Sequence, residues 1–419
     1  MSKPAEIRCT SGNIHLSVSK ANAGYDFDTV IDRYHTNSLK YDFAAERGYP
    51  ENVLPLWVAD MDFLAAPPVL EAMQETVNHG IFGYSKPKED YYEAAASWFA
   101  HYFGWKPGKS WLVKTPGVVF ALSMAVRAFT SPGDAVLIQT PVYYPFYSVI
   151  TNNQRTVVEN PLVYHDGNYQ IDFDDFEEKI REYHIRLFIL CSPHNPTGRV
   201  WKREELQKLG EICQKYQVIV ISDEIHCDFV LPGNRHYIFS QACPELAEST
   251  VICTAPSKTF NLAGLQISNI WVKNPELRRA FKKEIISCGY TEFNLFGLNA
   301  AKAAYQKGYD WHERSWEYIQ ENLNYLRRFL ERRIPEIRLT NSQGTYFAWL
   351  DCSGLGLDRE RLNHLIVHDA GLWLDAGHIF GEQGALFQRI VLACPRAVLR
   401  QALHQLENAV RKGVPEHGI

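Results

Sequence analysis

The sequence lacks the features that mark membrane-spanning, secreted and nucleic-acid-binding proteins. No apolar run reaches the roughly 18 residues that a transmembrane helix needs. The opening residues, MSKPAE, contain no apolar core of a secretory signal. The formal net charge is -5, whereas a nucleic-acid partner usually requires a basic surface. We therefore expect a cytoplasmic protein that has neither a membrane nor a nucleic acid as a partner.

Signals for disulfide bonds and structural metal sites are missing as well. The nine cysteines are an odd number, they are spread from Cys9 to Cys394, and no two of them form a CxxC pair. Such a distribution is typical of reduced, buried thiols, and not of a disulfide framework or a zinc site. We therefore expect no metal.

What the sequence does contain is a pattern of two kinds of domain. Its 419 residues are more than one ordinary core usually holds. Between residues 111 and 275, short apolar runs alternate with helical patterns, which is typical of an α/β domain with a mainly parallel sheet buried on both faces. Beyond this point long helices dominate, beginning with residues 275–287, and a few strands follow. This second pattern predicts a smaller α+β domain.

We place the large domain at residues 56–288 and the small domain at residues 289–419. An N-terminal segment, residues 1–55, shows no complete core of its own, so we expect it to pack with the small domain. Within that segment, residues 27–34 predict a short helix with Asp28 as its cap.

One lysine stands where a charged side chain is costly to bury. Lys258 follows a β-type run, residues 251–254, and precedes a turn of small residues. A desolvated lysine has a lowered pKa and becomes a nucleophilic amine, as Schiff-base chemistry requires. A surface lysine just past a strand end would explain the position equally well.

Two turns provide further candidates. Gly117 precedes a helix at a strand–turn–helix junction, where the backbone N–H groups of the first helical turn, at Val118 and Val119, could approach a phosphate. Asn195 lies in a turn with prolines on both sides, which fixes the direction of its amide group. Turns of both kinds are often purely structural.

Two charged residues lie within or at the end of β-type runs. Asp223 ends an apolar strand, where a carboxylate needs a cationic partner, unless it simply caps the segment that follows. Arg389 is a lone cation in a β-type run, and arginine holds carboxylates through two parallel hydrogen bonds. An arginine on the surface of an edge strand would look the same.

A single cofactor accounts for all of these residues. Lys258 would form a Schiff base, Asp223 would keep a pyridine nitrogen protonated, and Asn195 would contact the ring hydroxyl. The helix N-terminus would bind a phosphate, and Arg389 would hold the carboxylate of an amino-acid substrate. Together they predict a site for pyridoxal 5′-phosphate (PLP).

From about residue 27 to its C-terminus, the chain resembles the fold-type I PLP enzymes of the aminotransferase class I/II superfamily. Within that superfamily it is similar to the bacterial MalY/PatB-type C–S lyases, also called cystathionine β-lyases. The segments that carry the resemblance are residues 57–63 (WVADMDF), 82–85 (FGYS), 194–199 (HNPTGR), 223–226 (DEIH), 255–264 (APSKTFNLAG) and 393–396 (ACPR).

The resemblance implies a role for each matching residue. Lys258, Asp223 and Tyr143 would form the catalytic set, in which Lys258 moves the Cα proton and Tyr143 stacks on the ring. The substrate would contact Arg389, Tyr144 and Ala59. The cofactor would contact Lys258, Asp223, Asn195, Tyr143, Gly117, Val118, Val119, His226, Ser257 and Tyr84.

Tyr84 would reach the phosphate of the neighbouring subunit, so the resemblance implies a homodimer with shared active sites. Tyr144 has a plainer explanation as a core aromatic. Two positions depart from the wider aminotransferase pattern: His226 stands where many aminotransferases have tyrosine, and Gln266 stands where they have a cation near the phosphate. Both departures look like the lyase branch.

We therefore expect a PLP-dependent C–S β-lyase that converts L-cystathionine or other L-cysteine S-conjugates to pyruvate, ammonia and a thiol. An aminotransferase of aromatic or aliphatic amino acids would use the same residues and stays open. A regulatory protein that binds a protein partner through a PLP fold is the third possibility.

Overall fold

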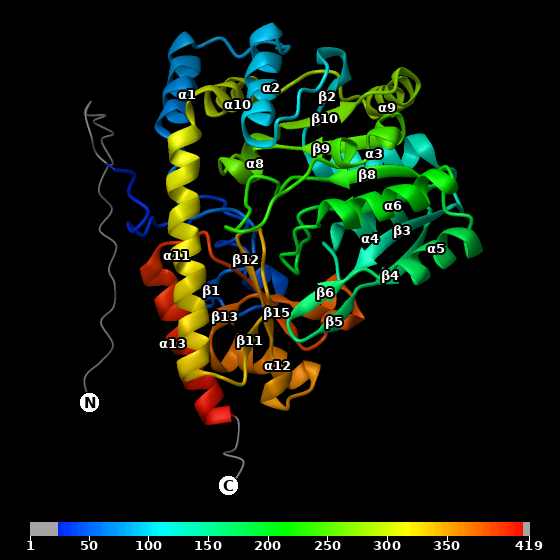
Figure 1. The fold of residues 1–419 in the computed structure, drawn as a ribbon. Coiled ribbons are helices and arrows are strands. Elements are labelled where there is room, and N and C mark those ends of the chain that lie inside the picture. The colour runs from blue at the N-terminus through cyan, green and yellow to red at the C-terminus, as the bar shows by residue number, and fades with distance from the viewer. Residues whose placement is uncertain (1–23, 414–419) are drawn as a thin grey trace.

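The computed structural model describes residues 24–413, so Cys9 and the first part of the expected N-terminal segment lie outside the described residues. Figure 1 shows a large sheet with helices on both sides and a smaller sheet below it, with the long helix α11 (Tyr309–Arg333) running alongside both. The prediction of an α/β fold with a mainly parallel large sheet and a smaller α+β part is confirmed.

The large sheet has seven strands in the order β2-β10-β9-β8-β7-β3-β4. The five strands from β9 to β4 run parallel, whereas β10 is antiparallel to both of its neighbours. The strands are β2 (Leu112–Thr115), β3 (Ala135–Thr140), β4 (Thr156–Pro161), β7 (Leu187–Cys191), β8 (Ile219–Asp223), β9 (Thr250–Thr254) and β10 (Ser268–Val272).

Alternation along the strands divides the core of this sheet into two layers. Val136 and Ile138 of β3 pack into one layer, with α3 (Val118–Phe129), α4 (Pro145–Thr151) and α9 (Pro275–Ser287). Leu137, between them, packs into the other, with α2 (Glu89–Phe103), α5 (Phe173–Glu182) and α6 (Arg203–Lys215). Helices on both faces explain why the strands are apolar throughout and not alternately polar.

The smaller sheet is antiparallel, in the order β11-β12-β15-β14. Its strands are β11 (Arg338–Leu339), β12 (Phe347–Asp351), β14 (Asp375–Ala376) and β15 (Phe387–Val391), with α12 (Arg359–His364) and α13 (Arg396–Gly413) nearby. The N-terminal segment joins this part of the molecule, because β1 (Leu54–Pro55) pairs with β13 (Leu372–Trp373). The domain boundaries at residues 55/56 and 288/289 stay a prediction.

The remaining elements connect these parts. They are α1 (Pro67–His79), the hairpin β5 (Val163–His165) and β6 (Asn168–Gln170), α7 (Phe239–Ala242), α8 (Pro256–Thr259) and α10 (Leu295–Lys307). None of the helices between residues 24 and 413 has the length and apolar character that crossing a bilayer requires.

The prediction of a short helix at residues 27–34 is wrong. That stretch forms bends and turns, because the carboxylate of Asp26 accepts hydrogen bonds from the backbone N–H groups of Asp28 and Thr29. A local side-chain-to-backbone turn of this kind competes with helix initiation.

Candidate active site

A cavity of about 180 Å³ opens at the carboxyl ends of the central strands of the large sheet. Asp223, the last residue of β8, lies opposite Cys191 of β7 and Cys253 of β9, so three parallel strands end together. In open α/β sheets, ligands bind at this edge. The cavity is lined by Ala59, Pro116, Gly117, Val118, Val119, Tyr143, Cys191, Asn195, Asp223, Ile225, His226, Ser257, Lys258, Ala263 and Ile267.

The structure thus brings together all the expected site residues except Tyr84, Tyr144 and Arg389. Tyr144 lies next to Tyr143, with 5.4 Å between the ring centroids, and is half-buried. Tyr84 lies elsewhere, at a larger and more open cavity of about 630 Å³ between α1 and α10. That second cavity contains none of the other expected site residues.

Asp223 is a buried carboxylate whose cationic partner is missing from the described part of the chain. Its side chain is 3% exposed, and its Oδ1 accepts one hydrogen bond, from the backbone N–H of Ile225 at 3.2 Å. Burial raises the pKa of Asp223 to about 7. Since a buried carboxylate is unfavourable without a partner, this position suits a ligand that carries a proton on a ring nitrogen.

Lys258 lies in α8, directly after β9, and its amine points toward residues far away in the sequence. Its Nζ donates a hydrogen bond to the carbonyl oxygen of Ala59 at 2.7 Å. Burial lowers the pKa of the Lys258 amine to about 8, while nearby Asp60 acts in the opposite direction. A larger fraction of such an amine is unprotonated near neutral pH than of an ordinary lysine, as a nucleophile requires.

His226 and Asn195 present neutral polar groups to the same cavity. The Nδ1 of His226 has no partner among residues 24–413, and burial lowers the pKa of the ring well below its usual value, so the imidazole is neutral. The Oδ1 of Asn195 accepts a hydrogen bond from Nη1 of Arg389 at 2.9 Å. Asn195 therefore connects the cavity to the arginine behind it.

Arg389 is buried inside the small sheet and is not an edge residue. It lies on β15, between β12 and β14, and its side chain is 2% exposed. Its Nη2 donates to the carbonyl oxygen of Trp57 at 3.0 Å and forms an ion pair with Asp375. Its Nε has no partner among the described residues, so the guanidinium retains a donor for a carboxylate.

Part of the cavity wall is formed by the N-terminus of α3. Gly117 precedes this twelve-residue helix, and a Cβ placed there would meet no atom within 4 Å. The first N–H groups of a helix have no intrahelical acceptor, and the helix dipole favours an anion. The open space before α3, in a cavity that Ser257 also lines, therefore suits a phosphate.

These residues fit pyridoxal 5′-phosphate. The uncompensated carboxylate of Asp223 suits the protonated ring nitrogen, and the amine of Lys258 is available for the aldehyde carbon. Tyr143 supplies an aromatic face at the cavity wall, and α3 suits the phosphate.

Sequence reasoning missed four residues that surround this site. Asp375 could have been found by the signal that marked Asp223, because it is a carboxylate just past the apolar run 372–374. The other three, Arg33, Lys40 and Asp62, belong to an ion cluster with Asp60. The spacing of these residues in the sequence does not predict the cluster, because its cations lie in turns and irregular structure that have no regular period.

Fold and cavity together define a class, the fold-type I PLP enzymes. The family model for aminotransferase class I and II matches residues 51–406. Cystathionine beta-lyase PatB of Bacillus subtilis is 41% identical over 385 residues, which cover 92% of this chain and 100% of PatB. Protein MalY of Escherichia coli is 33% identical, with 92% and 99% covered.

Among solved structures, cystalysin from Treponema denticola, which contains a PLP cofactor, superimposes with a TM-score of 0.90 at 38% identity. The alignment covers 93% of this chain and 100% of cystalysin. The chain belongs to the aminotransferase class I and II family, and it is similar to PatB and MalY over nearly its whole length.

Proposed function

We propose that this protein is a PLP-dependent C–S β-lyase, which converts L-cystathionine or other L-cysteine S-conjugates to pyruvate, ammonia and a thiol. The observation that carries the proposal is the convergence of Lys258, Asp223 and Asn195 on one cavity, with Arg389 hydrogen-bonded to Asn195 behind it. Its similarity to the cystathionine β-lyase PatB over 92% of the chain supports this choice among reactions of the family.

The residues of the cavity divide into groups that hold the cofactor and groups that act on the substrate. Bound PLP would supply an electron sink for the charge left when a substrate loses its Cα proton. Lys258 would hold it covalently, Asp223 at the ring nitrogen, and Asn195 at the ring oxygen. Tyr143 would contact the ring face, and His226 would lie on the side of the ring oxygen. The contacts to the phosphate would come from Gly117, Val118, Val119 and Ser257.

The chain's own groups would then bind and deprotonate the substrate. Arg389 would hold the α-carboxylate through Nε, which has no partner among residues 24–413, with Ala59 and Tyr144 bordering the substrate. The amine of Lys258, released by the incoming amino group, would take the Cα proton at Nζ. Loss of a thiolate from Cβ breaks the C–S bond, and the remaining fragment takes up water to give pyruvate and ammonia.

A screen over a panel of L-cysteine S-conjugates tests this proposal. The holoenzyme is incubated with each compound, and pyruvate and free thiol are measured together. A lyase releases both, repeatedly, from at least one thioether. An aminotransferase would instead accumulate pyridoxamine phosphate in proportion to enzyme without releasing thiol. Absence of both reactions, with a protein partner captured equally by wild type and Lys258→Ala, would favour a regulatory role.

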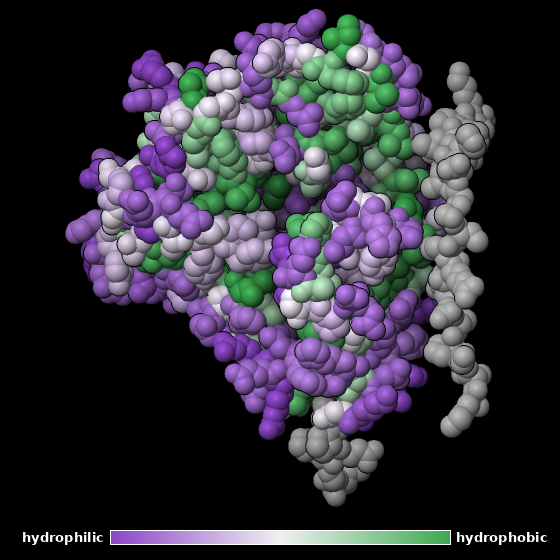
Figure 2. Space-filling model, turned by 180° about the vertical axis from the view of Figure 1, so that it is seen from behind, coloured by the Kyte–Doolittle hydropathy of each residue, from purple (hydrophilic) through white to green (hydrophobic). Residues whose placement is uncertain are grey.

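A cytoplasmic homodimer with shared active sites belongs to the same proposal. Tyr84 is 93% exposed, and Ile81 and Phe82 beside it are also exposed, which is unusual for large apolar side chains of a monomer. Figure 2 shows hydrophobic side chains on the upper and middle parts of one face, whereas hydrophilic side chains dominate its lower end. A second copy covering residues 81–84 would bring Tyr84 near the partner's phosphate site.

Subunit mixing tests the shared site. Lys258→Ala and Tyr84→Ala are each expected to lower activity strongly. In a mixed dimer, one active site would carry both changes and the other neither, so mixing should restore part of the activity. Two defective proteins that stay defective after proven subunit exchange would contradict a role for Tyr84 in the partner's site.

A further inference from the structure

Residues 57–63, which we call the ledge, connect the two cations of the candidate active site. The carbonyl oxygen of Trp57 accepts a hydrogen bond from Nη2 of Arg389 at 3.0 Å. The carbonyl oxygen of Ala59 accepts from Nζ of Lys258 at 2.7 Å and from the hydroxyl of Tyr346 at 2.9 Å. A displacement of the ledge would therefore disturb both the amine and the guanidinium.

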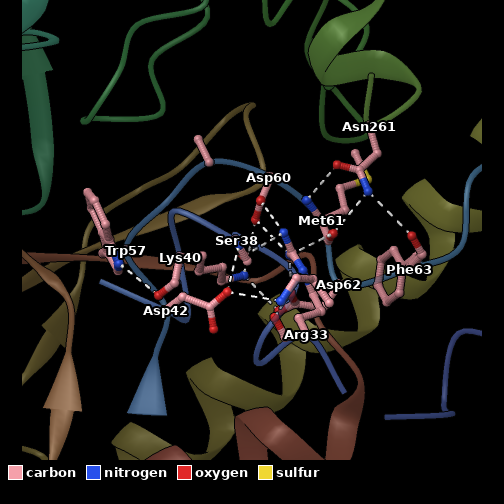
Figure 3. Close-up of polar contacts among 12 residues, drawn as sticks. Arg33, Ser38, Lys40, Asp42, Trp57, Asp60, Met61, Asp62, Phe63 and Asn261 are labelled. Carbon is pink, nitrogen blue, oxygen red and sulfur yellow. Dashed lines mark hydrogen bonds and ion pairs between the residues drawn. The ribbon is translucent and has the colours of Figure 1, made fainter. Parts of the chain in front are cut away.

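An ion cluster from the N-terminal segment holds the ledge (Figure 3). Arg33 binds Asp60 with two hydrogen bonds, from Nη2 to Oδ2 at 2.6 Å and from Nη1 to Oδ1 at 3.1 Å. The same Nη1 lies 2.6 Å from Oδ1 of Asp62, and Nζ of Lys40 lies 2.7 Å from its Oδ2. Two cations thus hold two carboxylates that alternate along the ledge.

Lys40 and Asp62 of this cluster are buried, Arg33 and Asp60 are partly exposed, and the four charges balance. Lys40 is 0% exposed and Asp62 is 4% exposed, so neither charge is solvated by bulk water. Buried ions persist only when they are paired and hydrogen-bonded, and removing one partner leaves the other uncompensated. With Arg33 and Asp60, the four side chains carry no net charge.

A separate contact ties the ledge to the segment that follows α8, the short helix that carries Lys258. The side chain of Asn261, three residues after Lys258, accepts from the N–H of Met61 and donates to its carbonyl oxygen, both at 2.9 Å. Asn261 also donates to the carbonyl oxygen of Phe63 at 3.3 Å. The segment that carries Lys258 is therefore joined to the ledge at the amine, through Ala59, and again at Asn261, through Met61 and Phe63. The ion cluster holds the ledge through Asp60 and Asp62.

The charge of the cluster also reaches the amine. Besides Asp60, the charged or titratable groups that act on Lys258 are Asp223 and Arg389, and His226 lies in the same cavity. Asp60 opposes the lowering of the Lys258 pKa by burial. On the other side of the cluster, the groups that face Asp62 and Lys40 are Tyr41 and Cys394.

We propose that Arg33 and Lys40 are positioning residues of this active site, which hold the ledge and balance the charge that Lys258 faces. Neither residue touches the cavity, so their effect on chemistry passes through the ledge carbonyls and through Asp60. A salt bridge that only stabilises the fold would lower the unfolding temperature and leave the environment of the bound cofactor unchanged.

A pH titration of the holoenzyme separates a positioning role from a purely stabilising one. It follows the visible absorbance band that the cofactor gives when it is bound to Lys258. Lys40→Met leaves the cluster one unit more negative, so the midpoint should rise by about half a pH unit to one unit. Asp60→Asn leaves it one unit more positive and should lower the midpoint. The double variant Lys40→Met/Asp62→Asn restores the balance and should return the midpoint toward that of wild type.

The matched control is Lys215→Met. Nζ of Lys215, at the exposed end of α6, lies 2.6 Å from Oε1 of Glu177, which is close to the 2.7 Å between Lys40 and Asp62. The midpoint of this control variant should equal that of wild type. If Lys40→Met does not fold, Arg33→Gln and Asp60→Asn decide the matter, with shifts in opposite directions. Unshifted midpoints in folded variants with lowered unfolding temperatures would overturn the proposal.

The inference rests on the proposed function only in that Lys258 binds the cofactor. The titration needs no substrate, so it gives the same answer for a lyase and for an aminotransferase. A protein that shows the predicted shifts but releases no pyruvate would keep the positioning role and lose the proposed reaction. A protein that releases pyruvate but shows no shifts would keep the proposed reaction and lose the positioning role.

Discussion

Asp375 and Arg389 are direct partners in the antiparallel ladder between β14 and β15, and their side chains form an ion pair inside the small sheet. The ion pair directs the guanidinium toward Asn195, at the border of the cofactor cavity. The arginine that we propose for the substrate carboxylate is thus carried by the small sheet, while the cofactor contacts that we propose at this cavity come from segments at the ends of strands of the large sheet.

Arg389→Lys should weaken substrate binding more than it slows turnover. Lysine keeps the positive charge beside Asp375 but cannot present two parallel donors to a carboxylate. Losing one charge-assisted hydrogen bond, worth about 1.5–3 kcal/mol, should raise KM about 10- to 150-fold. Steady-state kinetics with an amino-acid thioether measures this. Arg338→Lys, on the exposed strand β11 of the same sheet, is the control, and an unchanged KM for Arg389→Lys would exclude the assigned role.

Asp223→Asn should lower kcat by about 100-fold or more, because a preorganised charge aimed at a reacting group is typically worth that much. The same change should not destabilise the cofactor-free protein, since it removes a buried carboxylate that has no cationic partner within residues 24–413. Kinetics and thermal unfolding of the same preparation test both halves. Full activity in Asp223→Asn would show that the ring nitrogen lies elsewhere.

The stability of the cofactor-free protein should depend on pH through Asp223. Burial raises the pKa of this carboxyl from 3.8 to about 7 in the folded state. The folded state therefore binds a proton more tightly than the unfolded state, so stability falls as pH rises from about 4 to about 7 and changes no further above that range. Asp223→Asn lacks this contribution.

Thermal unfolding of the two cofactor-free proteins across this range provides the measurement. The wild-type midpoint should fall relative to that of Asp223→Asn up to about pH 7, after which the difference stays constant. Adding cofactor should reduce the difference, since a cationic ring nitrogen then pairs with the carboxylate. Parallel curves from pH 4 to pH 8 would mean that Asp223 titrates as an ordinary surface carboxyl.

Lys258 should capture the cofactor with a pH dependence unlike that of a free lysine. Because burial lowers the pKa of its amine to about 8, the unprotonated fraction becomes nearly complete above that pH. The rate at which cofactor-free protein gains its visible absorbance should therefore rise up to about pH 8 and then level off. A rate that still increases tenfold per unit beyond pH 9 would contradict this assignment.

Much of the site could be predicted from the sequence because its residues stand at the ends of apolar runs. Asp223 ends a strand, Lys258 and Asn195 each follow one, and neighbouring parallel strands end at one edge. The helix Pro275–Ser287 could be delimited for a similar local reason, since Asn274 caps it and proline occupies its first turn.

The parts that sequence could not provide depend on contacts between distant segments. Arg33 and Lys40 meet Asp60 and Asp62 across 22 to 29 residues of chain, and the cations lie in turns and irregular structure that show no hydrophobic period. The sequence around Arg389 is equally consistent with an exposed edge strand, and only the strand order β12-β15-β14 shows that Arg389 lies on an inner strand of the small sheet. Long-range pairing of this kind leaves no periodic trace in a single sequence.

The most direct test of the proposed lyase reaction is the stoichiometry of products from L-cystathionine. Wild-type holoenzyme should release pyruvate and thiol in equal amounts over many turnovers, while Lys258→Ala should show neither product nor the visible band of a lysine-bound cofactor. Wild-type enzyme that yields no pyruvate and no thiol, or a Lys258→Ala variant that retains the band, would contradict the account.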